Sequence, residues 1–419
     1  MALKWRMQCI HMEQIVLMSS KEISIPFDSF YTLDIEGFLL IKLKIFSPVH
    51  SFILDTEDKC WKSVFNPSQL QQLKLASNKL FCEYGEACKN MFSVFSKVIK
   101  DAKSRKLASI ASSSSTSSAA ATTAATDPSS SELTLTIKDE EDLIDELWER
   151  LAEIGLINPR KHYDLYWLQK TIDHFLNLYR FKVLEWVKNH GSEMDFINRV
   201  WTILDQVFDD IRVETRRDNG SVSATFIDNE DRAVAGMAAI AAKVSSIRPD
   251  LVLFQNGVEY GVAECGKGDD EEVGKKEIVE TSLDCPKIMK SMFLHAALKC
   301  DNDEGVTRAL QIVGFCHFDL RMKVLVMDNA NGYVCRIRST PQYEISTIPS
   351  QMSSGLLPIL KLTLRSKLTI QSSIKVVNDY FTPGEDNDPD FQASMDQNKT
   401  RLVLPRLQKS PNKKPKKSV

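Results

Sequence analysis

The spacing of hydrophobic and polar positions divides the chain into a helical part and a strand-rich part. Between residues 140 and 211, apolar residues recur every three or four positions, which is typical of helices that bury one face. From residue 222 onward, short apolar runs bounded by turn residues replace that spacing, and such runs indicate β-strands. The pattern therefore predicts a group of helices followed by a sheet.

Three helices are expected ahead of the sheet. The first ends at Gly155, because glycine commonly occupies the position just beyond a helix. The third begins after Ser192, whose side chain is expected to cap it, with Asp195 three residues on as the capping-box partner. The ranges of the three helices are residues 140–154, 163–189 and 193–211.

The strand-rich part contains one strong hairpin signal. Asn256-Gly257 separates two apolar runs, and this dipeptide favours a tight turn between antiparallel strands. A helix is expected to follow, since Pro286 suits the first turn of a helix. The predicted elements are, in order, strands at 222–227, 251–254 and 260–265, a helix at about 284–298, and strands at 310–318, 324–327 and 333–337.

Changes in composition set the expected domain boundaries. Residues 1–102 mix strand-like stretches (23–27, 38–46) with helical ones and are interpreted as a small N-terminal α+β domain or appendage. Residues 103–138 are predicted to be a disordered Ser-, Ala- and Thr-rich linker, because they bury too little apolar surface to offset the entropy of ordering. The remaining units are a helical region at 139–191, the main domain at 192–380 and a disordered tail at 381–419.

The composition excludes few classes of function. The 419 residues carry a formal net charge of −3, so binding of nucleic acid would have to come from local patches of positive charge. The cysteines and histidines show no zinc-ligand spacing. Scattered cysteines favour an intracellular protein of the nucleus or cytoplasm, and charged residues interrupt the apolar stretches, so no membrane span is expected.

One set of residues suggests chemistry. Arg248-Pro249-Asp250 precedes the predicted hairpin, and Glu264-Cys265-Gly266-Lys267 follows it. The arrangement resembles the signature of the PD-(D/E)XK, or restriction-endonuclease-like, superfamily and is similar to that of fungal and Crinkler-type nuclease-like proteins. The resemblance covers roughly residues 192–338. It implies an α/β (α+β) fold, in which a mixed central sheet flanked by helices forms the core and the N-terminal extension is helical.

The resemblance also implies roles for five residues. Asp250 and Glu264 would bind Mg²⁺ or Mn²⁺, with the carbonyl oxygen of Cys265 as a further ligand. Glu193 matches the acidic residue of the preceding helix, and Lys267 matches the lysine that orients or activates the attacking water. Hard cations prefer oxygen ligands and neutralise charge on a phosphate, so the implied function is metal-dependent hydrolysis of DNA or RNA. The alternative is that Asp250 caps a strand and Glu264 is a paired structural acid.

The position of Lys267 departs from the family pattern. The family usually has Glu-x-Lys, whereas the spacing here is Glu-x-x-Lys, so in a regular strand Lys267 would lie on the face opposite Glu264. A bulge at Gly266 would turn Lys267 back. Otherwise Lys287 or Lys290 of the next helix takes the role, or no lysine does. In the last case the domain is an inactive scaffold that binds nucleic acid or protein.

Strand parity provides a test of the shared site. A two-residue turn at Asn256-Gly257 would place Asp250 and Glu264 on opposite faces of the sheet, because side chains alternate along a strand. A three-residue loop or a β-bulge would place both acids on one face. In that register the helix at 193–211 is expected to cover them and to bring Glu193 toward the site.

The C-terminal end is basic. Residues 401–419 contain Lys and Arg but no acidic residue. They are predicted to be disordered and to act as a nuclear-import signal or as an electrostatic tether to nucleic acid. The alternative is a tail that only increases solubility.

Overall fold

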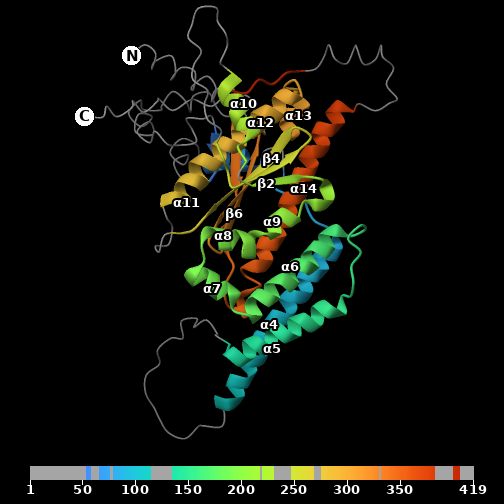
Figure 1. Ribbon diagram of the computed structural model, residues 1–419, viewed down its shortest axis with the longest axis vertical. Helices are drawn as coiled ribbons and strands as arrows, with labels where there is room; N and C mark the ends of the chain where they lie inside the picture. Colours follow the sequence, from blue (N-terminus) through green and yellow to red (C-terminus); the bar gives the residue numbers. More distant parts are fainter. Residues whose placement is uncertain are drawn as a thin grey trace, which may run out of the picture.

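The computed structural model describes residues 53–57, 66–75, 79–114, 135–217, 219–230, 247–268, 275–329, 332–382 and 400–405. Their strands form one eight-stranded mixed sheet in the order β1-β7-β6-β5-β4-β3-β2, with β8 paired to β6. Helices flank this sheet, so the expected mixed fold of helices around a central sheet is confirmed (Figure 1). The strands are β1 (Ile53–Asp55), β2 (Glu214–Arg217), β3 (Leu251–Gln255), β4 (Val258–Gly266), β5 (Gln311–Phe318), β6 (Arg321–Asp328), β7 (Cys335–Ser339) and β8 (Tyr343–Glu344).

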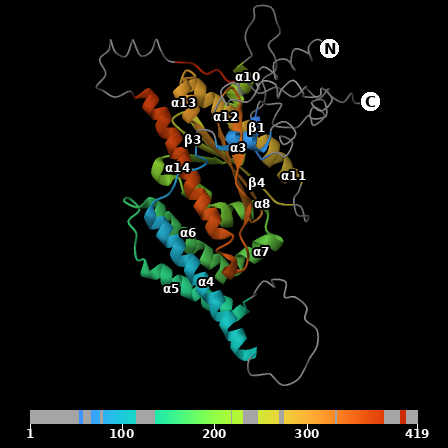
Figure 2. The same cartoon turned by 180° about the vertical axis from the view of Figure 1, so that it is seen from behind.

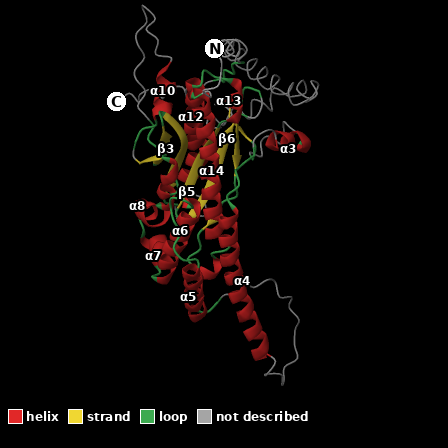
Figure 3. Cartoon of the chain, turned by 90° about the vertical axis from the view of Figure 1, so that its right-hand side faces the viewer, coloured by secondary structure: helices red, strands yellow, loops and turns green. Residues whose placement is uncertain are grey.

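Two groups of helices surround the sheet. The first group precedes β3 and comprises α3 (Pro67–Leu75), α4 (Glu86–Ser114), α5 (Ile137–Glu153), α6 (Tyr163–Arg180), α7 (Val183–His190), α8 (Glu193–Phe196), η4 (Ile197–Trp201), α9 (Ile203–Gln206), η5 (Asp209–Ile211) and α10 (Val222–Glu230). The second follows β4 and comprises α11 (Lys275–Val279), η6 (Glu280–Asp284), α12 (Cys285–Lys299), α13 (Glu304–Ala309), η7 (Pro349–Gln351) and α14 (Leu356–Phe381). Figures 1 and 2 show α4–α7 gathered at one end of the sheet. Figure 3 shows the same bundle below the strands.

Different helices cover the two faces of the sheet. A side chain at Gly314 of β5 would meet Cys285 of α12. A side chain at Gly261 of β4 would instead meet Ile370 of α14. Gly261 pairs with Val313, the neighbour of Gly314, and neighbouring residues point to opposite faces. The sheet therefore has an α12 face and an α14 face.

Several predicted elements are confirmed. Asn256-Gly257 connects β3 to β4, and Pro286 lies in the first turn of α12. Ser192 caps α8: its hydroxyl oxygen accepts the Asp195 N–H, while the Asp195 carboxylate accepts the Ser192 N–H. Both halves of the capping box therefore form as the sequence indicated.

The strand predicted at residues 222–227 is wrong, because these residues form helix α10. The buried carboxylate of Glu259, in β4, accepts the N–H groups of Val222 (2.7 Å) and Ser223 (3.1 Å) and the hydroxyl of Ser221 (2.7 Å). A carboxylate at a helix N-terminus satisfies donors that have no partner within the helix. The cap thus comes from a distant strand.

The described N-terminal residues belong to the main domain and do not form an appendage. β1 pairs in parallel with β7, and α4 packs against α5 and α6. Ile53 and Phe92 lie in the same hydrophobic core as the rest of the sheet. Residues 103–114 continue α4, so the linker prediction is wrong there. Residues 115–134 and the strands predicted at 23–27 and 38–46 lie outside the described residues.

Two predicted helices are interrupted. The pattern at 163–189 is divided between α6 and α7, which meet at Lys182 in a left-handed conformation (φ 53°). The pattern at 193–211 is broken by the π-helical turn η4. The spacing of apolar residues indicated most of the buried positions, but it failed at Phe181 and Trp186, which are exposed, and it did not locate these breaks.

The C-terminal part differs from its prediction in two places. The long helix α14 fills residues 356–381, for which no element was predicted. The first residues of the basic end, 401–419, are ordered and not disordered as predicted. The N–H of Leu402 donates to the carbonyl oxygen of Asn302, and the Leu402 side chain is buried. None of the described helices combines the length and apolar content needed to cross a membrane.

Candidate functional site

The turn between β3 and β4 has two residues. Asn256 and Gly257 both have positive φ, 50° and 80°, as a type I′ turn requires. Gln255 and Val258 pair directly on either side of the turn. With regular strands, this turn would separate Asp250 and Glu264 onto opposite faces.

A β-bulge in β4 brings Asp250 and Glu264 back to the same face of the sheet. Phe254 pairs with Glu259, but the next pair inward is Leu253 with Gly261. Tyr260 is therefore the extra residue, and it shifts the register of the rest of β4 by one position. The tight turn and the bulge together restore the parity that a shared acidic site requires.

The bulge brings Asp250 and Glu264 together. Leu251 pairs with Ala263, so Asp250 and Glu264, the next residue on each strand, stand opposite each other. Directly opposed residues of antiparallel strands share a face and lie close together. The Oδ2 atom of Asp250 also accepts the backbone N–H of Cys265 at 2.5 Å. That bond fixes the Asp250 carboxylate at the end of the hairpin.

Glu264 lies in an acidic and poorly hydrated environment. It is 9% exposed and is on the α12 face, beside Cys316. Burial, followed by the nearby Asp250, Glu280 and Asp284 carboxylates, raises the pKa of Glu264 to about 9. Glu280 and Asp284 come from η6, which leads into α12. The charged form of Glu264 is therefore strongly disfavoured in the free protein.

The largest influences on the pKa of Glu264 all raise it, and no cation is among them. Burial raises the pKa of Asp284, and the charge of Lys287 partly offsets that rise. Sequence reasoning missed Glu280 and assigned Asp284 only to a helix start. The signal for Asp284 was its position directly ahead of Pro286, at the start of the helix that packs against β4.

The lysine expected from the family pattern does not join the acids. β4 and β5 pair regularly from Gly261 to Gly266, so the bulge anticipated at Gly266 is absent from this pairing. Lys267 is exposed, and regular alternation directs it to the α14 face. Lys290 is fully buried, and burial lowers its pKa to about 8. Of the three candidates, Lys287 is the one associated with the acids.

The helical segment from α8 to η5 covers the opposite face from the one expected. The rings of Trp201 and His317 lie 5.1 Å apart, and those of Phe208 and Phe315 lie 6.5 Å apart. Phe315 and His317 lie on either side of Cys316 along β5. Because Cys316 points to the α12 face, these two rings point to the α14 face. The expectation that this segment covers the two acids is wrong, and Glu193 is not among the largest influences on the pKa of Glu264.

The donors fit a hard cation held by few protein ligands. Within the described ranges, no group of three or more His, Cys, Asp or Glu side chains is arranged closely enough to hold a metal ion. Asp250 and Glu264 alone supply two carboxylates, and Mg²⁺ commonly binds one or two carboxylates while keeping water and phosphate oxygens as its other ligands. A divalent cation here would also relieve the repulsion that raises the pKa of Glu264.

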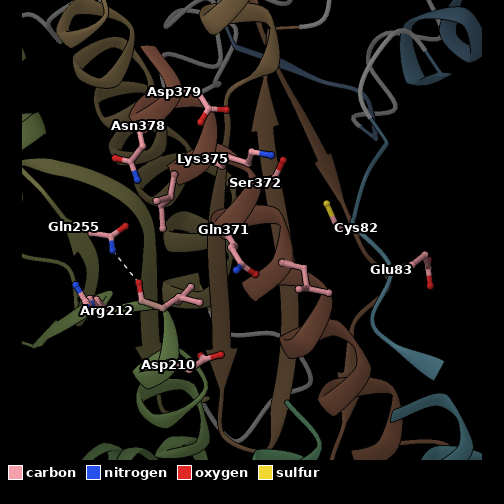
Figure 4. A pocket seen from close by; sticks show the side chains of 13 residues that line it. Cys82, Glu83, Asp210, Arg212, Gln255, Gln371, Ser372, Lys375, Asn378 and Asp379 are labelled. Carbon is pink, nitrogen blue, oxygen red and sulfur yellow. Dashed lines mark hydrogen bonds between the residues drawn. The ribbon is translucent and has the colours of Figure 1, made fainter. Parts of the chain in front are cut away.

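A groove of about 730 Å³ lies away from these acids, on the α14 face (Figure 4). The Nε2 atom of Gln255 donates to the carbonyl oxygen of Ile211 at one wall, and α14 forms the other. Charges of both signs line the groove, from Asp210, Arg212, Lys375 and Asp379. It neither continues the acidic site nor favours one sign of ligand charge.

Comparison with known proteins finds no match to this chain among family models, curated proteins or solved structures. The geometry of the acids is thus the main basis for assigning a function.

Proposed function

We propose that the chain is a metal-dependent nuclease of the PD-(D/E)XK type, acting on DNA or RNA phosphodiesters. The observation that carries the proposal is the placement of Asp250 opposite Glu264 by a tight turn combined with a compensating bulge. A bulge that re-aims a side chain is a recurrent feature next to active sites. A buried acid with a strongly perturbed pKa is also a recognised indication of a functional site.

The roles follow from the surroundings of each residue. Asp250 and Glu264 would hold Mg²⁺ or Mn²⁺, and the Asp250 carboxylate is oriented by the Cys265 N–H. The metal would supply a lowered pKa for water and neutralisation of charge on the phosphate. Lys287 would add a point charge beside the same phosphate, because it lies near Asp284 at the start of α12. Arg248, two residues before Asp250 and exposed, adds local positive charge for an anionic substrate.

The experiment is incubation of the purified protein with plasmid DNA and with RNA, in Mg²⁺ or Mn²⁺ and then in chelator. Cleavage that needs the metal and is lost in Asp250→Asn and Glu264→Gln supports the proposal. Asp379→Asn is the matched control, because it removes one exposed carboxylate on the other face. Cleavage by Glu264→Gln at the wild-type rate would contradict the assignment.

The choice of lysine can be tested in the same assay. Lys287→Ala is expected to lower kcat by about a hundredfold, the loss expected when a group that stabilises developing charge is removed. Lys267→Ala is expected to change kcat little, because the alternation of side chains along β4 directs Lys267 to the α14 face, away from the two acids. The opposite ranking would return the catalytic role to Lys267.

A second candidate, a non-catalytic scaffold that keeps the fold and binds nucleic acid or protein, is favoured by the displaced Lys267. Nucleic-acid binding without cleavage in either metal would select this candidate.

We also propose that the basic end of the chain serves nuclear import or tethering to nucleic acid. Deletion of residues 409–419, which lie outside the described residues, should reduce nuclear retention of a tagged protein or the salt dependence of nucleic-acid binding. No change in either measurement would leave a tail that only increases solubility.

A further inference from the structure

Arg216 of β2 is held against an aromatic ring beside the acidic site. Its guanidinium lies 3.5 Å from the ring centroid of Phe254 in β3. Two of its nitrogens donate to one oxygen of Glu214, at 2.9 and 2.6 Å. The Arg216 side chain remains 30% exposed and that of Glu214 61% exposed. The ring and the carboxylate therefore fix the orientation of the guanidinium while leaving it accessible to a solute.

Arg216 shares a sheet face with the two acids. It pairs with Val252, which is two residues from Asp250 on β3 and so on the same face. Phe254 lies four residues beyond Asp250, so the two positions are about 13 Å apart along the strand. That length corresponds to about four base-pair steps of a duplex at 3.4 Å each. A phosphate at Arg216 would therefore flank the phosphate at the acids.

We propose that Arg216, supported by Phe254, binds a backbone phosphate of nucleic acid that flanks the phosphate at Asp250 and Glu264. This inference rests on the proposed function for its substrate class. A planar guanidinium matches two phosphate oxygens, and stacking on a ring reduces the freedom lost when the phosphate binds. Contact with a phosphate carries no sequence information, so Arg216 contributes affinity that is independent of sequence. Glu214 competes with the phosphate for the same guanidinium.

The neighbouring Arg217 provides a matched control. It points to the other face, where it pairs with Asp205 through two hydrogen bonds of 3.1 and 2.7 Å. Its side chain is 25% exposed, close to the exposure of Arg216. The two arginines therefore differ mainly in the face of β2 from which they project.

The test measures binding of a fluorescently labelled DNA duplex and of its RNA equivalent over a series of salt concentrations without divalent metal, so that cleavage does not intervene. Arg216→Gln should weaken binding about tenfold and lower the slope of log K against log salt by about 0.9, the value of one lost phosphate contact. Arg217→Gln should leave the slope unchanged. Glu214→Gln should strengthen binding about twofold, because a competing exposed ion pair is weak. Circular dichroism identifies any variant that fails to fold.

The possible results separate this inference from the proposed function. Binding that depends on Arg216 without cleavage in any metal would support the phosphate contact and reject the nuclease. Cleavage that is unchanged in Arg216→Gln, with an unchanged salt slope, would reject the phosphate contact and leave the nuclease. Equal losses in the Arg216 and Arg217 variants, or no binding by the wild type, would overturn the inference as well.

Discussion

Two buried carboxylates in one sheet have opposite electrostatic environments. Asp328 of β6 is fully buried, but it accepts two hydrogen bonds from Arg336 (2.8 and 2.6 Å) and one from Arg338 (2.7 Å). Glu264 of β4 is nearly as buried, yet the charges around it are other carboxylates, led by Asp250. The first carboxylate is compensated by two arginines, whereas the charges that act most strongly on the second are like charges.

The difference shows that burial of an acid does not by itself mark a functional site. A buried ion cluster such as Asp328 with two arginines has its charge balanced inside the protein. An acid surrounded by like charges is destabilised in its charged form, and such perturbed acids cluster at functional sites. The contrast therefore predicts opposite responses to mutation, pH and metal.

The largest effect is expected from Asp328→Asn. This change leaves the guanidinium groups of Arg336 and Arg338 buried with a neutral partner. Loss of one member of a buried ion cluster lowers the free energy of unfolding by about 3–5 kcal/mol. Chemical denaturation measures it. Glu264→Gln is the paired variant and should lose no stability at neutral pH, because Gln resembles the protonated acid but has no proton for the unfolded chain to release. Equal losses in the two variants would remove the distinction.

The second prediction concerns pH. The folded pKa of Glu264, about 9, lies above its ordinary value of 4.5, so the folded state holds this proton more tightly than the unfolded state does. The resulting stability is complete below pH 4.5 and is lost as pH rises toward 9. The free energy of unfolding of the wild type, relative to Glu264→Gln, should therefore fall with increasing pH in this window, by up to about 1.4 kcal/mol per unit. A constant difference between pH 5 and 9 would contradict the environment described for Glu264.

The third prediction concerns metal. Mn²⁺ at a hundredfold excess over its Kd should raise the free energy of unfolding of the wild type by about 2.7 kcal/mol. The expected stabilisation is absent in Asp250→Asn and Glu264→Gln, and it persists in Asp328→Asn, because the Asp328 carboxylate is already saturated with hydrogen bonds from arginine. Thermal melting with and without Mn²⁺ measures all four proteins. Stabilisation of the Glu264 variant equal to that of the wild type would place any bound metal elsewhere.

The smallest effect sharpens the role of the bulge. A Cβ at position 261 would lie 2.9 Å from the carbonyl oxygen of Val313 and 2.9 Å from Cδ1 of Leu253. Gly261→Ala should therefore lower the free energy of unfolding by about 1–3 kcal/mol, as overpacking typically does. It should also weaken Mn²⁺ binding, because the bulge sets the register of Glu264. Loss of stability with unchanged Mn²⁺ affinity would show that the register does not depend on Gly261.

Local sequence signals predicted the elements that are determined locally. Asn256-Gly257 favours positive φ at both positions, and the resulting turn is the one observed. Ser192 and Asp195 form their capping box because both partners lie within one turn. The position of two acids at the ends of neighbouring strands also followed from the hairpin. These features require only residues close to one another in the chain.

Features that depend on distant residues were not predicted. Helix α10 was interpreted as a strand because its N-terminal cap, Glu259, comes from β4. The bulge at Tyr260 lies within the hairpin itself, but no residue signal in the sequence marks its position. The segment that follows Glu193 covers the α14 face because Trp201 packs against His317, and the sequence gives no sign of that contact. In each case, tertiary contacts override or complete the local preference.

The parallel pairing of β1 with β7 has a consequence for the order of folding. Thr56 bonds to Ile337, 281 positions later, through both its N–H and its hydroxyl. Contacts between such distant residues form late, because the entropy of closing a long loop must first be overcome. During synthesis, β1 leaves the ribosome long before β7 exists. Its apolar Ile53 must therefore remain unpaired until the rest of the sheet has been made.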